Sequence, residues 1–405
     1  MHDFRGKLSD PRVAPMVEDY LRRARARRAG VDATPPADSQ SPAFGPLSIN
    51  LDLTMACDYR CGHCIDSDLL NTGLKLEFRE LENTLRVLAG KGLRSVILIG
   101  GGEPTLHPDF ERAVSLIKSL GLQCAIASNG AHNDGIAAAV HRLEQGDWVR
   151  LSLDAGMEKT FQALHRPRKA VTLENICRTA ASLKERRPQL QLGFSFVVMW
   201  AGAGQVSSPI MSNAGEMALA AGLAKAHGFD YISFKPMLVR NEERAEIVNV
   251  GRLPDNSRPL VPAPVVEQIR VGLRQAEALG GVSFRVVPSK NLVAMLQEFG
   301  FERCRRQPRE CHMQHFRQVL TPSGIFACPA HRGNQRSRIC DRTAYCTIDG
   351  FEGAFAKTQA QIRRFNAAEE CREVTCIYND TNWWIEELIE SGEALTPGAA
   401  ADLFL

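Results

Sequence analysis

The sequence predicts an α/β protein, built as a partial (β/α)6 TIM-like barrel with a small cysteine-rich α+β domain at its C-terminal end. Short apolar segments alternate with amphipathic, helix-like segments six times between residues 47 and 237. Strand–helix units in sequence are typical of a parallel sheet. Seven of the twelve cysteines then gather in residues 304–376, where turn-forming residues are frequent. An open doubly wound sheet is the alternative that the same pattern allows.

The first 46 residues predict a helix and a linker in front of the barrel. Residues 13–29, "VAPMVEDYLRRARARRA", have helical character, and Pro15 lies early, where a helix tolerates it. Their arginines are expected on a solvated face rather than on a phosphate. Residues 30–46 are rich in Pro, Ala, Ser and Asp, which is typical of a linker.

The barrel is expected over residues 47–240. Wholly apolar runs such as "SVILIG" are typical of strands buried in a parallel sheet. The predicted strands are 47–54, 95–100, 123–129, 148–155, 190–199 and 230–237. The predicted helices between and after them are 77–90, 108–120, 133–145, 171–186 and 213–227.

The chain after the barrel divides into two predicted parts. Residues 241–300 form a connecting segment with a helix over 263–280 and a candidate strand over 282–287. Residues 301–405 form the cysteine-rich domain, which ends in an amphipathic helix over 382–390.

Composition excludes several classes of protein. A net charge of +3 over 405 residues is too small to indicate binding to nucleic acid or to an acidic membrane. No apolar run reaches the ~18 residues of a membrane span, and the polar N-terminus lacks the core of a secretion signal. We therefore expect a cytoplasmic protein that binds neither nucleic acid nor a membrane. In that reducing compartment cysteines act as metal ligands, buried thiols or redox groups.

Three cysteines directly follow the first predicted strand, at Cys57, Cys61 and Cys64. This position puts them at the carboxyl end of the strands, the face on which such barrels carry their chemistry. Three thiolates are one short of the four that close a structural zinc site. They suit an iron–sulfur cluster that keeps one iron free, with a zinc knuckle or buried thiols as the alternative.

The C-x3-C-x2-C spacing, with Tyr59 and His63 inside it, resembles the radical S-adenosylmethionine (SAM) superfamily. The resemblance implies that the three cysteines bind a [4Fe–4S] cluster whose free iron is chelated by SAM. It implies that reduction cleaves SAM to a 5′-deoxyadenosyl radical, which abstracts a hydrogen atom from the substrate. It also implies an external electron donor such as flavodoxin or ferredoxin.

A second motif, "GGGEP", ends the second predicted strand. Glycines allow close approach of backbone to a ligand. The motif resembles the family's GGEP sequence, in which Gly101, Gly102 and Glu103 bind the amino group of SAM.

Polar residues also end the third and fourth predicted strands, where a barrel of this kind binds its ligands. The resemblance implies that they contact the ribose and methionine parts of SAM. These residues are Ser128, Asn129, Ser152 and Asp154. In "HRPRK", Arg166 or Arg168 is a candidate for the SAM carboxylate. A solvated basic loop is the alternative.

The tail segment "TPSGIFACP" resembles the β-turn of SPASM and twitch extensions, which carry auxiliary iron–sulfur clusters. The resemblance implies at least one auxiliary [4Fe–4S] cluster, and the sequence does not decide between one such cluster and two. Structural zinc is the alternative metal. The expected ligands are Cys311, Cys328, Cys371 and Cys376. Cys304 is an alternative ligand, and Cys340 and Cys346 form a C-x5-C element. The closing C-x4-C spacing departs from the usual C-x2-C.

We expect a small polar substrate, such as a sugar or aminocyclitol of a natural-product pathway, that is dehydrogenated, dehydrated or epimerised. Only about 46 residues precede the first strand, fewer than the ~80 of a small peptide-binding domain. A peptide maturase and a non-catalytic iron–sulfur electron carrier are the alternatives. Lys235, His312 and His315 are candidate acid–base groups, but no catalytic role is assigned, because a lone Lys or His is more often structural.

Overall fold

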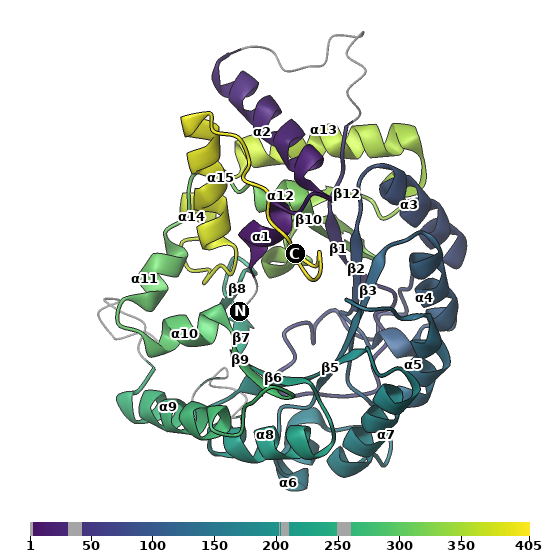
Figure 1. Cartoon of the computed structure of the whole chain (residues 1–405), viewed down its shortest axis with the longest axis vertical. Helices are drawn as coiled ribbons and strands as arrows, with labels where there is room; N and C mark the ends of the chain where they lie inside the picture. Colours follow the sequence, from purple (N-terminus) through teal and green to yellow (C-terminus); the bar gives the residue numbers. More distant parts are fainter. Residues whose placement is uncertain (1–2, 31–42, 202, 204–209, 249–260) are drawn as a thin grey trace.

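The computed structural model describes residues 3–30, 43–201, 203, 210–248 and 261–405. Residues 31–42 of the predicted linker therefore lie outside the described residues. Viewed close to the barrel axis, a curved parallel sheet forms the inner wall and helices cover its outer side (Figure 1).

The six predicted strands are confirmed, and they pair in parallel in chain order. They are β1 (Ser48–Asp52), β2 (Ser95–Ile99), β3 (Gln123–Ser128), β4 (Trp148–Ser152), β5 (Gln191–Val198) and β6 (Tyr231–Pro236). The covering helices are α3 (Phe78–Gly90), α4 (Phe110–Ser119), α5 (Asn133–Ala139), α6 (Glu158–His165), α7 (Leu173–Arg186) and α8 (Met217–Ala226).

Two later strands lengthen the parallel sheet at both edges. β9 (Arg285–Pro288) pairs in parallel with β6, and β10 (Arg317–Thr321) pairs in parallel with β1. From β10 the sheet continues through two short antiparallel strands, β11 (Gly324–Phe326) and β12 (Arg338–Cys340). The cysteine-rich tail is thus joined to the barrel by a continuous hydrogen-bonded sheet.

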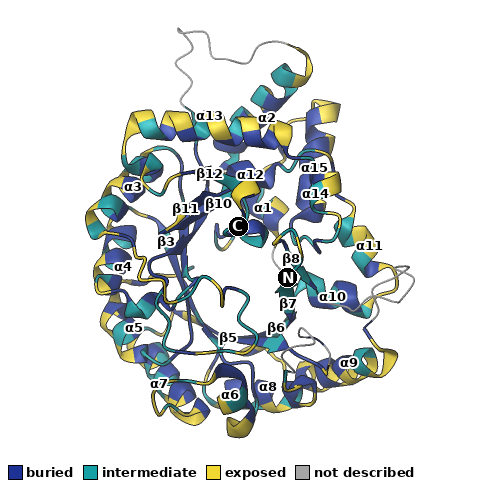
Figure 2. Ribbon diagram, turned by 180° about the vertical axis from the view of Figure 1, so that it is seen from behind, coloured by how far each residue is buried: buried dark blue, intermediate teal, exposed yellow. Residues whose placement is uncertain are grey.

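Alternation along the strands separates an apolar outer face from a more polar lumen. On β1, Ile49 and Leu51 pack into the main core beneath the helices. Asn50 and Asp52 therefore face the opposite side, into the lumen. The outer helices bury one face and expose the other (Figure 2), as expected for amphipathic helices on a sheet.

The last residues of the chain lie across the amino end of the barrel. Phe404 packs against Trp148, with 5.5 Å between ring centroids, and joins Ile97 and Ala125 in a small buried cluster. Ser95 Oγ donates to the Leu403 carbonyl at 2.8 Å, and Lys7 Nζ donates to the Phe404 carbonyl at 2.7 Å. The lumen is therefore closed at this end, opposite the strand tips that carry the cysteines.

The remaining helices build the tail and the segment before it. They are α9 (Ala263–Glu277), α10 (Lys290–Leu296), α11 (Gly300–Arg305), α12 (Met313–Phe316), α13 (Ile348–Arg364), α14 (Ala367–Glu370) and α15 (Asn379–Ser391). A hairpin of β7 (Leu238–Arg240) and β8 (Glu246–Val248) follows β6.

At the other end of the chain, α1 (Phe4–Leu8) and α2 (Ala14–Arg28) precede the barrel. Val17 and Tyr20 of α2 share a second core with Phe316 and Ile385. The N-terminal helix predicted from the sequence is confirmed and docks on the cysteine-rich tail.

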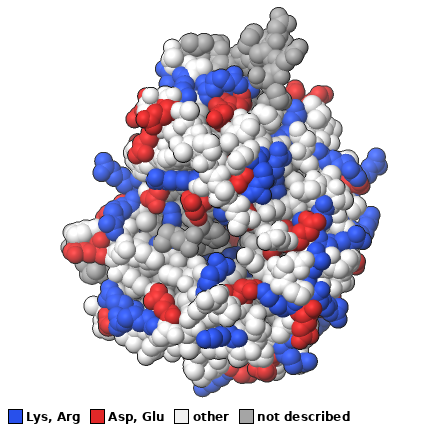
Figure 3. All heavy atoms as spheres, in the orientation of Figure 1, with Lys and Arg blue, Asp and Glu red and all other residues white. Residues whose placement is uncertain are grey.

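The described helices include none long and apolar enough to cross a membrane. On the face seen in Figure 3, basic and acidic side chains are interspersed.

Replacing Phe404 by Ala should lower the free energy of unfolding by about 3 kcal/mol or more, because its ring is buried against Trp148. Denaturant unfolding of the full chain measures the change. Val282→Ala, at a fully exposed position, is the control and should stay within about 0.5 kcal/mol. Equal stabilities of the two variants would contradict a closing role for the C-terminal residues.

Candidate functional site

The loop between β1 and α3 carries Cys57, Cys61 and Cys64 at the carboxyl edge of the barrel. Asn71 Oδ1 accepts a hydrogen bond from the Cys57 amide at 3.0 Å and ties the two ends of the loop together. Burial raises the pKa of Cys57 and of Cys64 to about 11, since a thiolate there loses its hydration. Three close thiols of this kind become thiolates when a metal centre supplies positive charge.

The glycine motif after β2 is joined to the cysteine loop by backbone hydrogen bonds. The Gly102 amide donates to the Thr54 carbonyl at 3.2 Å, and the Glu103 amide donates to the Ala56 carbonyl at 2.8 Å. A Cβ on Gly102 would lie 2.3 Å from the Ala56 oxygen, and one on Gly101 would lie 2.4 Å from Met55 Cε. Glycine is therefore required at position 102, where the neighbouring atoms are backbone, whereas at position 101 the flexible end of Met55 would have to move.

The Glu103 carboxylate connects the ends of β2 and β3. Its Oε1 accepts from the amide and hydroxyl of Thr105 and from Ser128 Oγ, the last at 2.8 Å. Its Oε2 accepts from the Asn129 amide at 2.7 Å. Burial raises the pKa of Glu103 in spite of these donors. Three of the residues expected at SAM thus lie together beside the cysteine loop.

Asp154 lies just beyond β4 in a left-handed backbone conformation, with φ at 51°. Its Oδ2 accepts from His63 Nε2 at 3.0 Å, and its Oδ1 accepts from the Val197 amide at 2.6 Å. Burial by itself would raise the pKa of Asp154, but the hydrogen bond from His63 contributes to a net lowering of that pKa. The carboxylate therefore anchors a residue of the cysteine loop to the fourth and fifth strands.

His165, which was not among the predicted site residues, contacts the cysteine loop directly. Its Nδ1 lies 3.3 Å from Cys61 Sγ, and its Nε2 lies 2.9 Å from the Leu153 carbonyl. Burial lowers the pKa of His165 to about 4, so the ring is neutral. The sequence does contain a pointer to this residue, because His165 is the first residue of the "HRPRK" segment. The prediction for that segment named its arginines alone.

Two other expected residues lie near this group without contacting it. The Ser152 side chain faces the lumen on β4 and stays partly exposed. Arg166 is exposed at the end of α6, and a Cβ on Gly62 would lie 3.5 Å from its guanidinium. Arg168, the other arginine considered, is also exposed, and its amide donates to the Asp58 carbonyl at 3.0 Å.

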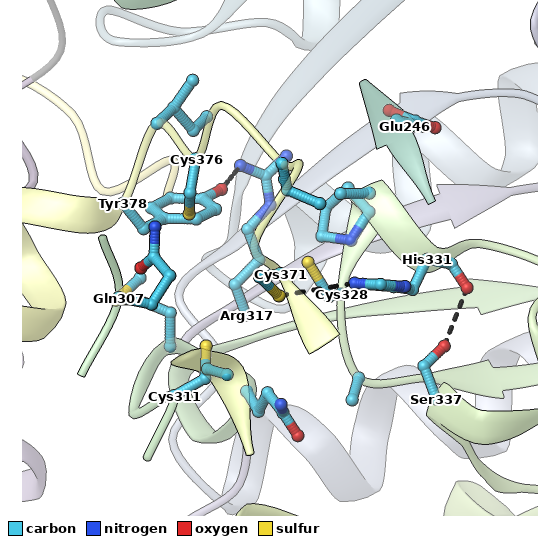
Figure 4. A pocket seen from close by; sticks show the side chains of 18 of the residues that line it. Glu246, Gln307, Cys311, Arg317, Cys328, His331, Ser337, Cys371, Cys376 and Tyr378 are labelled. Atoms are coloured by element: carbon cyan, nitrogen blue, oxygen red, sulfur yellow. Dashed lines mark hydrogen bonds between the residues drawn. The ribbon is translucent and has the colours of Figure 1, made fainter. Parts of the chain in front are cut away.

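A second cysteine site lies in the tail. Four of its seven cysteines line one cavity of about 160 Å³ (Figure 4). They come from four separate segments, before α12, after β11, after α14 and before α15. These four are Cys311, Cys328, Cys371 and Cys376.

The other three tail cysteines do not line this cavity. Cys304 lies on α11, and Cys340 lies on β12. Cys346 Sγ lies 3.4 Å from Thr84 Oγ1 of α3. The fold thus separates the C-x5-C pair from the four cysteines of the cavity.

The spacing of the sulfurs can be compared with that of a zinc site. In a tetrahedral zinc site, Zn–S bonds of about 2.3 Å set thiolate sulfurs ~3.8 Å apart. Among the described residues, the only group of three or more His, Cys, Asp or Glu whose ligand atoms all lie within 4.8 Å is His63, Asp154 and His165. No three cysteine sulfurs at either site are therefore all within 4.8 Å of one another in the described residues.

Donors surround the cavity in the tail. Asn382 Nδ2 lies 3.6 Å from Cys311 Sγ, and His331 Nε2 lies 3.6 Å from Cys371 Sγ. Burial raises the pKa of Cys328 to about 12. Hydrogen bonds to cysteine sulfur tune iron–sulfur clusters, so the polar surroundings suit such a group.

A buried ion cluster lies between the two cysteine sites. Arg332, four residues after Cys328, donates to Asp66 Oδ2 at 2.7 Å and to the Gly100 carbonyl at 2.9 Å. Its Nη2 also lies 3.3 Å from Asp52 Oδ1. Burial by itself would lower the pKa of Arg332. The charges of Asp52 and Asp66 outweigh this effect and raise the pKa of Arg332 above its ordinary value. One side chain of the tail thus contacts the cysteine loop, the glycine motif and the end of β1.

The comparison with known families gives this site its class. Residues 51–205 match the family model of the radical SAM superfamily. The chain therefore contains a radical SAM domain. Such a domain implies a [4Fe–4S] cluster and SAM, and the cysteine and glycine loops described above lie inside the matched residues.

Similar proteins share this part of the chain. An S-adenosylmethionine-dependent nucleotide dehydratase of Thermoplasmatales archaeon (strain ISO4-H5) is 31% identical over 153 residues, 37% of this chain and 52% of that protein. A GTP 3′,8-cyclase of Chlorobaculum tepidum is 33% identical over 121 residues, 29% of this chain and 36% of that protein. The chain spans about half or less of the length of these relatives.

A solved structure shows the fold over a longer stretch. Histidine-tagged anSMEcpe with bound AdoMet superposes with a TM-score of 0.53 at 13% identity, over 86% of this chain and 97% of that one. At this identity the likeness shows the fold alone.

Replacing Arg332 by Met should lower the free energy of unfolding by about 3 kcal/mol or more, because it leaves Asp52 buried without a cation and leaves Asp66 with Arg240 alone. Denaturant unfolding measures the loss. Arg342→Met removes a half-exposed arginine that pairs with Glu80 at 3.1 Å, and should cost about 1 kcal/mol or less. A loss no larger than that of the control would show that the buried ion cluster does not hold the two sites together.

Proposed function

We propose that the protein is a radical SAM enzyme that cleaves SAM reductively and abstracts a hydrogen atom from a small polar metabolite. The observation that carries the proposal is the joined pair of loops at the open edge of the barrel. There Cys57, Cys61 and Cys64 lie on a loop that hydrogen-bonds to the glycine motif. Reductive cleavage of SAM needs an iron–sulfur cluster and, beside it, backbone that a bound ligand can approach closely. The two joined loops offer both.

Cys57, Cys61 and Cys64 would hold a [4Fe–4S] cluster. When bound, that cluster supplies the electron that splits SAM into methionine and a 5′-deoxyadenosyl radical. The neutral His165 ring, whose Nε2–H donates to the Leu153 carbonyl, would pack beside Cys61 Sγ and exclude water from it. The residues proposed to hold SAM around it are Gly101, Gly102, Glu103, Ser128, Asn129, Ser152, Asp154 and Arg166.

The tail cavity would hold one auxiliary [4Fe–4S] cluster on Cys311, Cys328, Cys371 and Cys376. Four partly buried cysteines from four separate segments line a single cavity, which supports a multi-cysteine metal centre there. The auxiliary cluster would exchange electrons with the substrate or with an external donor such as flavodoxin or ferredoxin. Cys304, Cys340 and Cys346 have no place in this set.

The substrate would be small and polar, of the sugar or aminocyclitol kind, and would enter the lumen from the strand tips. Phe404 and its neighbours close the opposite end. Two relatives are named for reactions of nucleotides, which are themselves small and polar. Dehydrogenation, dehydration and epimerisation all begin with the same hydrogen abstraction.

Replacing Cys57, Cys61 and Cys64 together by Ala should abolish formation of 5′-deoxyadenosine from SAM and dithionite, while about four irons per chain remain in the tail. Anaerobic reconstitution, iron analysis and chromatography of the nucleoside give both quantities. Loss of all iron would contradict the auxiliary site. Persistent 5′-deoxyadenosine would contradict the proposed function itself.

Replacing Cys328 by Ala should remove the iron of the tail, about four atoms per chain, and leave the iron at the first cysteine loop. Cys346→Ala removes a thiol that lies outside the cavity and should leave the iron content unchanged. Iron and acid-labile sulfide are counted per chain in both variants. An unchanged count in the Cys328 variant would remove that residue from the ligand set.

A further inference from the structure

Three adjacent strands, β4, β5 and β6, present a row of hydroxyl groups to the lumen. Ser152 pairs in register with Ser195, and Ser195 pairs in register with Ser233. The neighbouring residues Phe194 and Phe234 lie in the outer core. Because side chains alternate along a strand, the three serines face the lumen side by side.

Two cations flank this row on the same face of the sheet. Arg150 stands two residues before Ser152 on β4, and Lys235 stands two residues after Ser233 on β6. Arg150 lies over the ring of Trp148, with 5.0 Å to the ring centroid. Since Trp148 belongs to the cluster that closes the lumen, the guanidinium lies just above the closed end.

These polar groups lack partners within the described part of the chain. Arg150 Nε and Ser233 Oγ are both buried without a hydrogen-bond partner. Neither Arg150 nor Lys235 forms an ion pair or donates a side-chain hydrogen bond to any described residue. The nearest carboxylate to influence Lys235 is Asp154, whose oxygens already accept from His63 and Val197.

The lumen has room beside them. Arg150, Ser152, Val197, Tyr231 and Lys235 all remain partly exposed, whereas their neighbours on the outer face are fully buried. Because the amino end of the barrel is closed, this exposure is to the space that opens at the strand tips.

Placing the Arg150 and Lys235 cations in the lumen without an anionic partner disfavours their charged forms. Burial, and then the charge of Arg150, lower the pKa of Lys235 to about 7, and Asp154 offsets only part of the effect. Buried charges in proteins are ordinarily paired. Two cations without an ion pair, in the same lumen as the unsatisfied Ser233 hydroxyl, indicate that an anionic partner comes from outside the chain.

We propose that the substrate carries an oxyanion, a phosphate or a carboxylate, which binds in the lumen to Arg150, Lys235 and the hydroxyls of Ser195 and Ser233. An oxyanion accepts charge-assisted hydrogen bonds from all four groups. Ser152, in the same row, belongs to the residues proposed for SAM, so the site lies next to the SAM contacts. This assignment rests on the proposed function and narrows its substrate class.

The test measures anion binding by calorimetry on the reconstituted holoenzyme with SAM present, using inorganic pyrophosphate and succinate as probes. At least one probe should bind the wild-type protein. Arg150→Met and Lys235→Met should each weaken that binding by about tenfold or more, the effect of losing a charge-assisted hydrogen bond. Arg150→Lys and Lys235→Arg should restore part of it. Lys225→Met, which removes the same charge from the exposed end of α8, is the matched control.

Other results would overturn the assignment. Binding of neither probe, or equal binding by the variants and the control, would exclude an oxyanion site. Weaker SAM binding with unchanged probe binding would show that the two cations hold the SAM carboxylate instead. Iron content and unfolding midpoint identify variants that fail to fold. If probe binding depends on the two cations while 5′-deoxyadenosine never forms, the proposed function fails and the oxyanion site stands. If 5′-deoxyadenosine forms while probe binding does not depend on the two cations, the oxyanion site fails and the proposed function stands.

Discussion

The burial of Arg332 between Asp52, Asp66 and the Gly100 carbonyl is the contact on which the arrangement of both cysteine sites depends. A cation in this position is tolerable only while its carboxylates stay in place. The residue belongs to the tail, but its partners belong to the first strand, the cysteine loop and the glycine motif. The tail therefore cannot move away from the barrel edge without separating Arg332 from Asp52, although Asp66 would keep its ion pair with Arg240. This constraint keeps the two candidate cluster sites at a fixed separation.

The lumen that opens at this edge of the barrel contains polar groups without hydrogen-bond partners among the described residues. Phe404 closes one end of the lumen, so a ligand approaches from the strand tips, past the cysteine loop. Beyond it lie the serines of β4–β6 and the cations Arg150 and Lys235, which form no ion pair with any described residue. A radical formed at the cysteine loop would thus meet a substrate whose anionic end is held deeper in the barrel.

Much of this could be predicted from the sequence, because it depends on local patterns. Short apolar runs located the six parallel strands to within three residues at every end, close to the usual uncertainty of element ends. Contacts between distant segments could not be predicted. β10 joins β1 across more than 260 residues, and His165 reaches Cys61 across 104. The helix α13 was missed because its buried face includes the polar residues Thr358 and Gln361 and because Gly350 and Gly353 are poor helix formers, and Arg332 carried no motif at all.

The most direct measurement is the count of iron and sulfide per chain after anaerobic reconstitution, followed by addition of dithionite and SAM. Two occupied cluster sites predict about eight irons, at four per cluster, together with 5′-deoxyadenosine. About twelve irons would add a second auxiliary cluster, for which the cavity offers only four cysteines. About four irons, or no 5′-deoxyadenosine from protein with a full complement of iron, would contradict the claim that two cluster sites serve one radical SAM reaction.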